Sequence, residues 1–194
     1  MPLDETGDGL CFLGMMIIRD CARQKSVLLK QLIIMDKSDI KPGHLRRIKS
    51  LAHLSDDQLL AFLNYVELVE FAQAATLFQD GQPGDSMYLI LQGQMWVSTQ
   101  KKNSEGAVFL RTLEMGDAFG EIALITQMPR TATIEVAQSS VLIKITAGAL
   151  YKLMAEQPAI AAQFLFHIAR SLGGELGNLT TKLRARTEME DLFS

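Results

Sequence analysis

The chain has 194 residues, of which 48% are hydrophobic and 21% charged, and its formal net charge is −3. This composition is typical of an ordered globular protein with its own core, and the acidic balance gives no basic field for nucleic acid. The two cysteines, Cys11 and Cys21, are too few for a disulfide framework, so a reducing, cytoplasmic location is expected.

The first fifty residues differ in charge from the rest of the chain. They hold nine Lys and Arg against six Asp and Glu, whereas the remainder carries a net charge of −6. Apolar periodicity predicts two amphipathic helices, near 10–24 and 26–36. The apolar run 10–18 is too short to span a bilayer, and acidic residues precede it where a signal peptide would be basic. Residues 1–50 are expected to pack on the main domain or to bind a partner or a second copy.

The pattern changes to short strands between Val66 and Ile145. A capping box, with Ser55 as the N-cap and Gln58 three residues later, predicts a helix that leads into this region. Turn signals rich in Gly, Pro, Asn and Asp separate five β-branched or aromatic segments, namely 66–71, 87–91, 95–99, 108–113 and 141–145. This spacing favours a sandwich or jelly roll over alternating βαβ units. Trp96 is expected in the core.

The chain becomes helical again after Thr146. Residues 149–154 and 158–172 have apolar residues at helical spacing. A seam suited to packing on the barrel or on a second copy then follows at intervals of four, three and four: Leu172, Leu176, Leu179 and Leu183. Three glycines weaken any helix there by about 1 kcal/mol each and form a candidate hinge: Gly173, Gly174 and Gly177.

The stretch from Gly116 to Thr133 carries the most specific chemistry. Gly120 lacks a Cβ, so a ligand can approach its backbone closely. A helical turn over 122–126 would direct free N–H groups at an anion. Glu121 only accepts hydrogen bonds when ionised, which suits ribose hydroxyls, and Arg130 offers a planar fork of donors for phosphate. A Glu and an Arg at this interval more often form a surface ion pair, but the whole pattern predicts a site for a small anionic sugar phosphate.

These residues resemble a known family. Phe119 to Thr133 is similar to the phosphate-binding cassette of the cyclic nucleotide-binding domain family, and an upstream pattern is similar to the turn and strand of that family: Gly81-x-x-Gly84-Asp85-x-x-Tyr88-x-Ile90-x-x-Gly93. The resemblance implies an α+β, mainly β fold, a jelly-roll β-barrel with flanking N- and C-terminal helices. The expected parts are a helical extension (1–50), the cyclic nucleotide-binding domain (51–176), and a lid or dimerisation helix with a tail (177–194).

The resemblance also implies a role for each residue of the cassette. Glu121 would bind the ribose 2′-hydroxyl, and Arg130 would bind the cyclic phosphate. Backbone amides would complete the cradle, those of Gly120, Ile122, Ala123 and Thr131. In the family a C-terminal helix folds over the bound base and often dimerises, and Leu176 and Leu179 are the residues best placed to do so.

The function implied is a non-catalytic receptor that signals to a protein partner, or as a homodimer, through its C-terminal helix. The expected ligand is cAMP, with cGMP as the alternative, because Thr131 fits either. No metal site is expected, since His44, His53 and His167 lie outside the predicted barrel. Only 22 residues follow Leu172, too few for a helix-turn-helix, so a stand-alone domain that does not bind DNA is expected.

Two other functions remain open at this stage. The fold can serve as a ligand-independent protein interaction module, although an abandoned pocket would not need both Glu121 and Arg130. A cyclic dinucleotide is also possible, but a larger ligand would require a second basic residue near the cassette, and the sequence does not reveal one.

Overall fold

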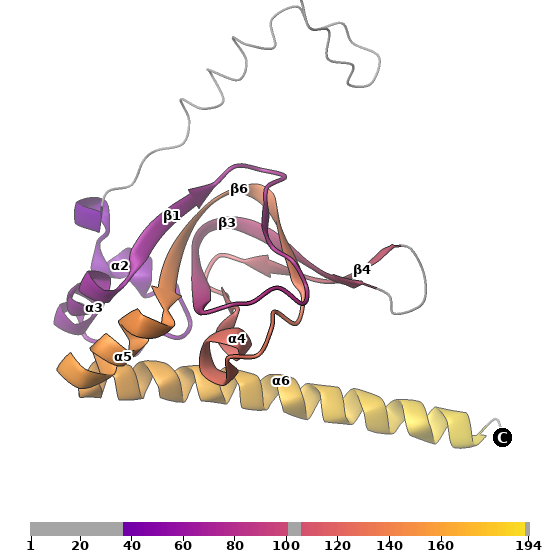
Figure 1. The fold of residues 1–194 in the computed structure, drawn as a ribbon. Coiled ribbons are helices and arrows are strands. Elements are labelled where there is room, and N and C mark those ends of the chain that lie inside the picture. Colours follow the sequence, from indigo (N-terminus) through magenta and orange to yellow (C-terminus); the bar gives the residue numbers. More distant parts are fainter. Residues whose placement is uncertain (1–36, 101–105, 193–194) are drawn as a thin grey trace, which may run out of the picture. The chain divides into compact units, whose positions relative to one another are not determined.

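The structure is a computed structural model that describes residues 37–100 and 106–192 (Figure 1). The helices predicted near 10–24 and 26–36 lie outside these residues. The first part of the described chain is helical, with η1 (Lys37–Asp39), α2 (Pro42–Leu45), α3 (Asp56–Phe62) and η2 (Leu63–Tyr65). The strands and the helix among them are β1 (Glu67–Phe71), β2 (Thr76–Phe78), β3 (Ser86–Gln100), β4 (Ala107–Glu114), β5 (Ala118–Phe119), α4 (Glu121–Thr126) and β6 (Thr133–Thr146). The helices α5 (Ala147–Glu156) and α6 (Pro158–Leu192) follow.

The strands form one antiparallel sheet around the long central strands β3 and β6. The path runs β1-β6-β3-β4, while β2 pairs with β6 and β5 pairs with β3. Figure 1 shows β1, β6 and β3 curling around a common interior, with α5 and α6 following the sheet. The predicted mainly β, jelly-roll fold with flanking helices is confirmed.

The predicted break between two strands at residues 92–94 is wrong. β3 is a single strand through this point, because Gly93 has φ +99° and lets the chain bend without ending the ladder. The register with β6 shifts on both sides of Gln92 and Gln94. A Cβ at residue 93 would meet the side chain of Ser140 on β6, so the bend also brings the two strands unusually close.

The capping box that leads into the barrel is confirmed. Ser55 Oγ accepts a hydrogen bond from the Gln58 amide at 3.3 Å, and Gln58 Oε1 accepts one from the Ser55 amide at 2.9 Å. These two bonds satisfy donors at the start of α3. The helix then buries Leu59 and Phe62 completely.

Two apolar clusters form the core. One lies inside the barrel and is built from Tyr88, Ile90, Met95, Leu113, Phe119, Ile134, Val136 and Leu142, with Val97 beside them. The other joins the helices to the sheet, and Phe62 and Phe164 meet in it with ring centroids 5.3 Å apart. Ile40, Leu45 and Ile48 belong to this second cluster. Packing therefore runs across residue 50, the expected end of the N-terminal extension, and that division stays a prediction.

Trp96 is not in the core, contrary to the prediction. Its side chain is 48% exposed, whereas its neighbours Met95 and Val97 are buried. Residues alternate between the two faces of a strand, so the position that follows Met95 points outward. Trp96 pairs with Thr112 of β4 on that outer face.

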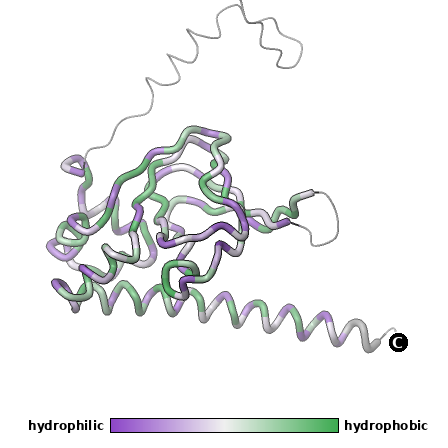
Figure 2. The backbone as a smooth tube through the Cα atoms, viewed as in Figure 1, coloured by the Kyte–Doolittle hydropathy of each residue, from purple (hydrophilic) through white to green (hydrophobic). Residues whose placement is uncertain are grey.

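α6 is one continuous helix through the three glycines that suggested a hinge. Its first half is buried through Ile160, Phe164 and Ile168, and Leu172 is half-buried. Hydrophobic residues continue to alternate with hydrophilic ones beyond that point (Figure 2), but Leu176 and Leu179 are exposed. Among the described helices, none combines the length and the apolarity needed to cross a membrane.

Candidate functional site

The cassette is held on the barrel by short pairings. β5 pairs with β3 through Tyr88↔Phe119 and Leu89↔Ala118, which fixes the entry to α4. Gly120 is the N-cap of α4 with φ +80°, a left-handed conformation that favours glycine. A Cβ there would lie 2.7 Å from Arg130 Nη1 and 3.1 Å from the Ser86 carbonyl oxygen. The predicted helical turn is therefore present, and glycine is needed at its start.

Arg130 is a buried cation. Its side chain is 5% exposed, and Nη1 donates to the carbonyl oxygens of Ser86 at 2.6 Å and Gly120 at 3.3 Å. Nη2 donates to Ser86 Oγ at 3.1 Å, and the guanidinium carbon lies 4.0 Å from the centroid of the Phe78 ring. Nε has no hydrogen-bond partner among the described residues. All the bonded acceptors are neutral oxygens.

The charge of Arg130 is incompletely compensated. No carboxylate of the described residues lies within 4.0 Å of it, although Asp85 and Glu121 act on it from farther away. Burial lowers the pKa of Arg130, and Tyr88, Asp85 and Glu121 oppose that shift. Arginine still remains protonated at neutral pH. A buried cation of this kind is costly unless an anion approaches it.

Glu121 lies beside Arg130 as the first residue of α4. Its Oε2 atom is buried and has no hydrogen-bond partner within the described chain. Burial raises the pKa of the Glu121 carboxyl, and Glu175 also raises it, whereas its own backbone amide, Arg111 and Arg130 lower it. The side chain therefore presents an acceptor with no donor, which suits a ligand hydroxyl.

The structure places Arg130 against Gly120, whose carbonyl oxygen accepts from Nη1 at 3.3 Å, and Glu121 is the next residue along the chain. Ile122 and Ala123 lie on the same first turn of α4, and Ala123 is buried. Thr131 is exposed immediately after Arg130. The role of each residue toward a ligand is taken up below as a proposal.

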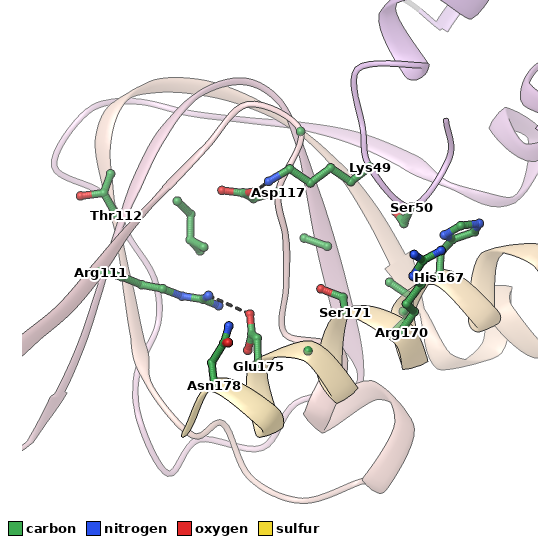
Figure 3. Close-up of a pocket in the computed structure, with 15 residues that line it drawn as sticks. Lys49, Ser50, Arg111, Thr112, Asp117, His167, Arg170, Ser171, Glu175 and Asn178 are labelled. Carbon is green, nitrogen blue, oxygen red and sulfur yellow. Dashed lines mark hydrogen bonds and ion pairs between the residues drawn. The ribbon is translucent and has the colours of Figure 1, made fainter. Parts of the chain in front are cut away.

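Sequence reasoning missed two charged residues close to this site. Arg111 of β4 forms a salt bridge with Glu175 of α6, with Nη1 2.8 Å from Oε1 (Figure 3), and both act on the pKa of Glu121. Arg111 is therefore a second basic residue near the cassette, one that the sequence alone did not reveal. In the sequence, Arg111 is a single charged residue that directly follows the apolar residues 108–110 of a predicted strand. A charge at this position was the only sequence feature that could have drawn attention to it.

A pocket of about 500 Å³ lies between this region and α6. Arg111 and Thr112 line it from β4, and Glu175 and Asn178 line it from α6. Glu121 and Arg130 do not line it. The pocket thus includes the Arg111–Glu175 pair, whose two charges act on Glu121.

The described residues contain no group of three or more His, Cys, Asp and Glu side chains placed to hold a metal ion. His53 and His167 stack on each other with ring centroids 3.8 Å apart and an interplanar angle of 5°. This contact joins the segment before α3 to α6.

Comparison with known proteins agrees with this geometry. Residues 68–157 match the family model described as the cyclic nucleotide-binding domain. This part of the chain belongs to the cyclic nucleotide-binding domain family. The match spans β1 to α5 and includes the whole cassette, so the resemblance seen in the sequence is confirmed.

Relatives of this cyclic nucleotide-binding domain occur in larger proteins. A cGMP-dependent protein kinase of Drosophila melanogaster (isozyme 1) is 32% identical over 68% of this chain and 20% of its own length. A CRP-like cAMP-activated global transcriptional regulator of Mycobacterium tuberculosis is 29% identical over 62% of this chain and 54% of its own length. The chain thus spans between a fifth and about half of these relatives.

A solved structure of a cyclic nucleotide-binding domain from Methylobacillus flagellatus shares the fold. It superposes with a TM-score of 0.67 at 20% identity, covering 75% of this chain and 85% of that one. At this identity the likeness concerns the fold alone, and it supports the jelly-roll assignment.

Proposed function

We propose that this chain is a non-catalytic, cytoplasmic receptor for a cyclic nucleotide. The observation that carries the proposal is a pair of neighbouring buried groups with unsatisfied atoms, Arg130 Nε and Glu121 Oε2. A cyclic phosphate would supply the anion that Arg130 lacks. A ribose 2′-hydroxyl would supply the donor that Glu121 lacks. One ligand of the family's own class would therefore satisfy both groups.

The backbone would complete the binding site. The amides of Gly120, Ile122, Ala123 and Thr131 are proposed to contact the phosphate and the sugar. Support comes from the left-handed Gly120, because the missing Cβ lets the Arg130 guanidinium lie directly against the start of this turn.

The identity of the base rests on a residue outside the cassette. The sequence predicts cAMP as the ligand. Arg111 is the observation that makes cGMP the second candidate. Guanine presents two adjacent acceptors, O6 and N7, to an arginine fork, whereas adenine presents a donor beside N7. Arg111 acts on Glu121 and is therefore close to the proposed ribose site. The two relatives named above divide in the same way, one named for cGMP and the other for cAMP.

Signalling is proposed to pass through α6 to a protein partner or a second copy of the chain. Glu175 connects α6 to Arg111 beside the cassette. Beyond this pair, α6 exposes Leu176, Leu179 and Leu183, which are 67%, 57% and 65% exposed. These leucines repeat at coiled-coil intervals, and a second helix would cover them.

Calorimetric titration with cAMP and with cGMP tests the receptor proposal. We expect saturable binding of at least one nucleotide and a stabilisation against heat that rises with its concentration. Absence of both effects at millimolar nucleotide would favour the ligand-independent interaction module instead.

A further inference from the structure

One end of the pocket against α6 has polar groups that the proposed nucleotide site does not use. Ser50 lines it from the segment before α3, and Arg170 and Ser171 line it from α6. Figure 3 shows Ser50, His167 and Arg170 gathered at one end of the view, and Arg111 and Asn178 at the other.

Ser50 has a buried hydroxyl group that makes no hydrogen bond with the described residues. It is only 7% exposed, and its Oγ atom has no hydrogen-bond partner in the described part of the chain. The neighbouring residue is held firmly, since the Lys49 amide donates to the Gly116 carbonyl oxygen at 3.2 Å. A buried hydroxyl without a partner is unfavourable, so a bound group that pairs with it would gain affinity.

At this end of the pocket, Arg170 is a cation without a carboxylate partner among the described residues. Lys49 Nζ lies 2.6 Å from Asp117 Oδ1, and Asp117 Oδ2 accepts from the Glu114 amide at 2.9 Å, so this pair is internally balanced. Burial lowers the pKa of His167, and the nearby His53 and Arg170 lower it further, so this imidazole adds no charge at neutral pH.

We propose that this end of the pocket binds a phosphate group, with Arg170 as its charge partner and Ser50 as a buried hydroxyl donor. Ser171 also lines the pocket and can add a hydroxyl donor. A phosphate has more acceptor oxygens than a carboxylate and matches donors that converge from several directions. The cavity of about 500 Å³ is within the usual range for a small-molecule site.

Inorganic phosphate is the probe that tests the site. Thermal unfolding and calorimetric titration would compare phosphate with chloride at equal ionic strength. We expect Arg170→Gln to weaken phosphate binding about tenfold or more, and Ser50→Ala to weaken it without lowering the melting temperature in chloride. Arg184→Gln is the matched control, because it removes an exposed arginine of α6 that does not line the pocket. If phosphate acts no differently from chloride, or if Arg170→Gln behaves like Arg184→Gln, the proposal is overturned.

The source of the phosphate is distinguished by a second set of titrations. If a cyclic dinucleotide spans the pocket, Arg170→Gln will weaken its binding but not that of cAMP or cGMP, and inorganic phosphate will compete with it. If the ligand is a separate phosphate compound, phosphate and a cyclic mononucleotide will bind together, with additive stabilisation. Phosphate binding without nucleotide binding would support this site while rejecting the receptor proposal.

Discussion

The cassette and the distal half of α6 differ in which groups lack a partner: buried polar atoms in the cassette and exposed apolar side chains on α6. The cassette buries polar groups, Arg130 and Glu121, whose hydrogen-bonding capacity the protein does not fill. The distal half of α6 exposes apolar side chains that no other described element covers. Buried polar atoms require a polar ligand, whereas exposed leucines at regular spacing require an apolar surface. In the proposed receptor, the ligand site and the signalling surface are therefore separate regions of the chain, and the Arg111–Glu175 pair lies between them.

The largest effect is expected at the leucine seam. Replacing Leu176 and Leu179 together by Glu should abolish a dimer formed along α6, because each buried leucine contributes roughly 1.5 to 3 kcal/mol and each occurs twice in a symmetric pair. Sedimentation equilibrium would measure the mass. Lys182→Glu on the same helix is the control for a change of charge. A wild-type protein that is already monomeric at high concentration would exclude the homodimer and leave only a different protein partner.

The second effect concerns the buried cation. Arg130→Ala should weaken cyclic nucleotide binding by roughly 10- to 150-fold, corresponding to about 1.5 to 3 kcal/mol for hydrogen bonds to a charged group. Arg130→Lys retains the charge without the fork and should lose less. Calorimetric titration gives the constants, and a melting curve of each variant checks that the barrel is folded. Equal affinity in Arg130→Ala and the wild type would contradict the assignment.

Base selection should depend on Arg111. If its guanidinium reads guanine, Arg111→Ala will reduce the preference for cGMP over cAMP by about 1 to 3 kcal/mol, the range for a bidentate arginine contact with a base. Arg184→Ala, which removes an arginine from a remote part of α6, should leave the preference unchanged. Competition binding with both nucleotides measures the ratio. An unchanged ratio would remove the reason to consider cGMP and leave cAMP as the expected ligand.

A smaller effect is expected from the carboxyl of Glu121, and its direction depends on pH. Because burial raises the pKa of this group above its ordinary value of 4.5, its contribution to stability is fully present below that value and is lost as pH rises through the raised one. In the Glu121→Gln variant, the side chain at position 121 is uncharged at every pH. This variant should therefore be more stable than the wild type at neutral pH and should lose this advantage in acid, while binding the nucleotide more weakly.

Urea unfolding of Glu121→Gln and the wild type between pH 4 and 8 would measure the difference. Glu188→Gln, at an exposed position on α6, serves as the control for the loss of one carboxylate. If the two stability profiles of Glu121→Gln and the wild type run parallel, the carboxyl is not perturbed by the fold.

The smallest effect is expected from the link between the two regions. Arg111 and Glu175 have side chains that are 48% and 45% exposed, so their ion pair should contribute only about 0 to 1 kcal/mol to stability. Glu175→Gln should change the melting temperature little but should alter how nucleotide binding affects the assembly of α6. Sedimentation with and without nucleotide tests this, and identical behaviour of variant and wild type would remove the pair from the signalling route.

The sequence by itself determined the features that depend on neighbouring residues. The Ser55–Gln58 capping box and the α4 turn after Gly120 are set by hydrogen bonds and dihedral angles within a few positions. Glu121 and Arg130 were also singled out from the sequence, because their interval and the residue types between them resemble a known cassette, and their shared role toward a ligand stays a prediction.

Only the tertiary structure decided what depends on partners distant in the chain. The short strands β2 and β5 exist because β6 and β3 pair with them, and the outward direction of Trp96 follows from its register beside Thr112. Arg111 meets Glu175 across 64 positions, and Ser50 and Arg170 share a pocket only because α6 packs against the segment before α3. Local propensity is read from adjacent residues, but the pairing of strands and the packing of helices are chosen by the fold as a whole.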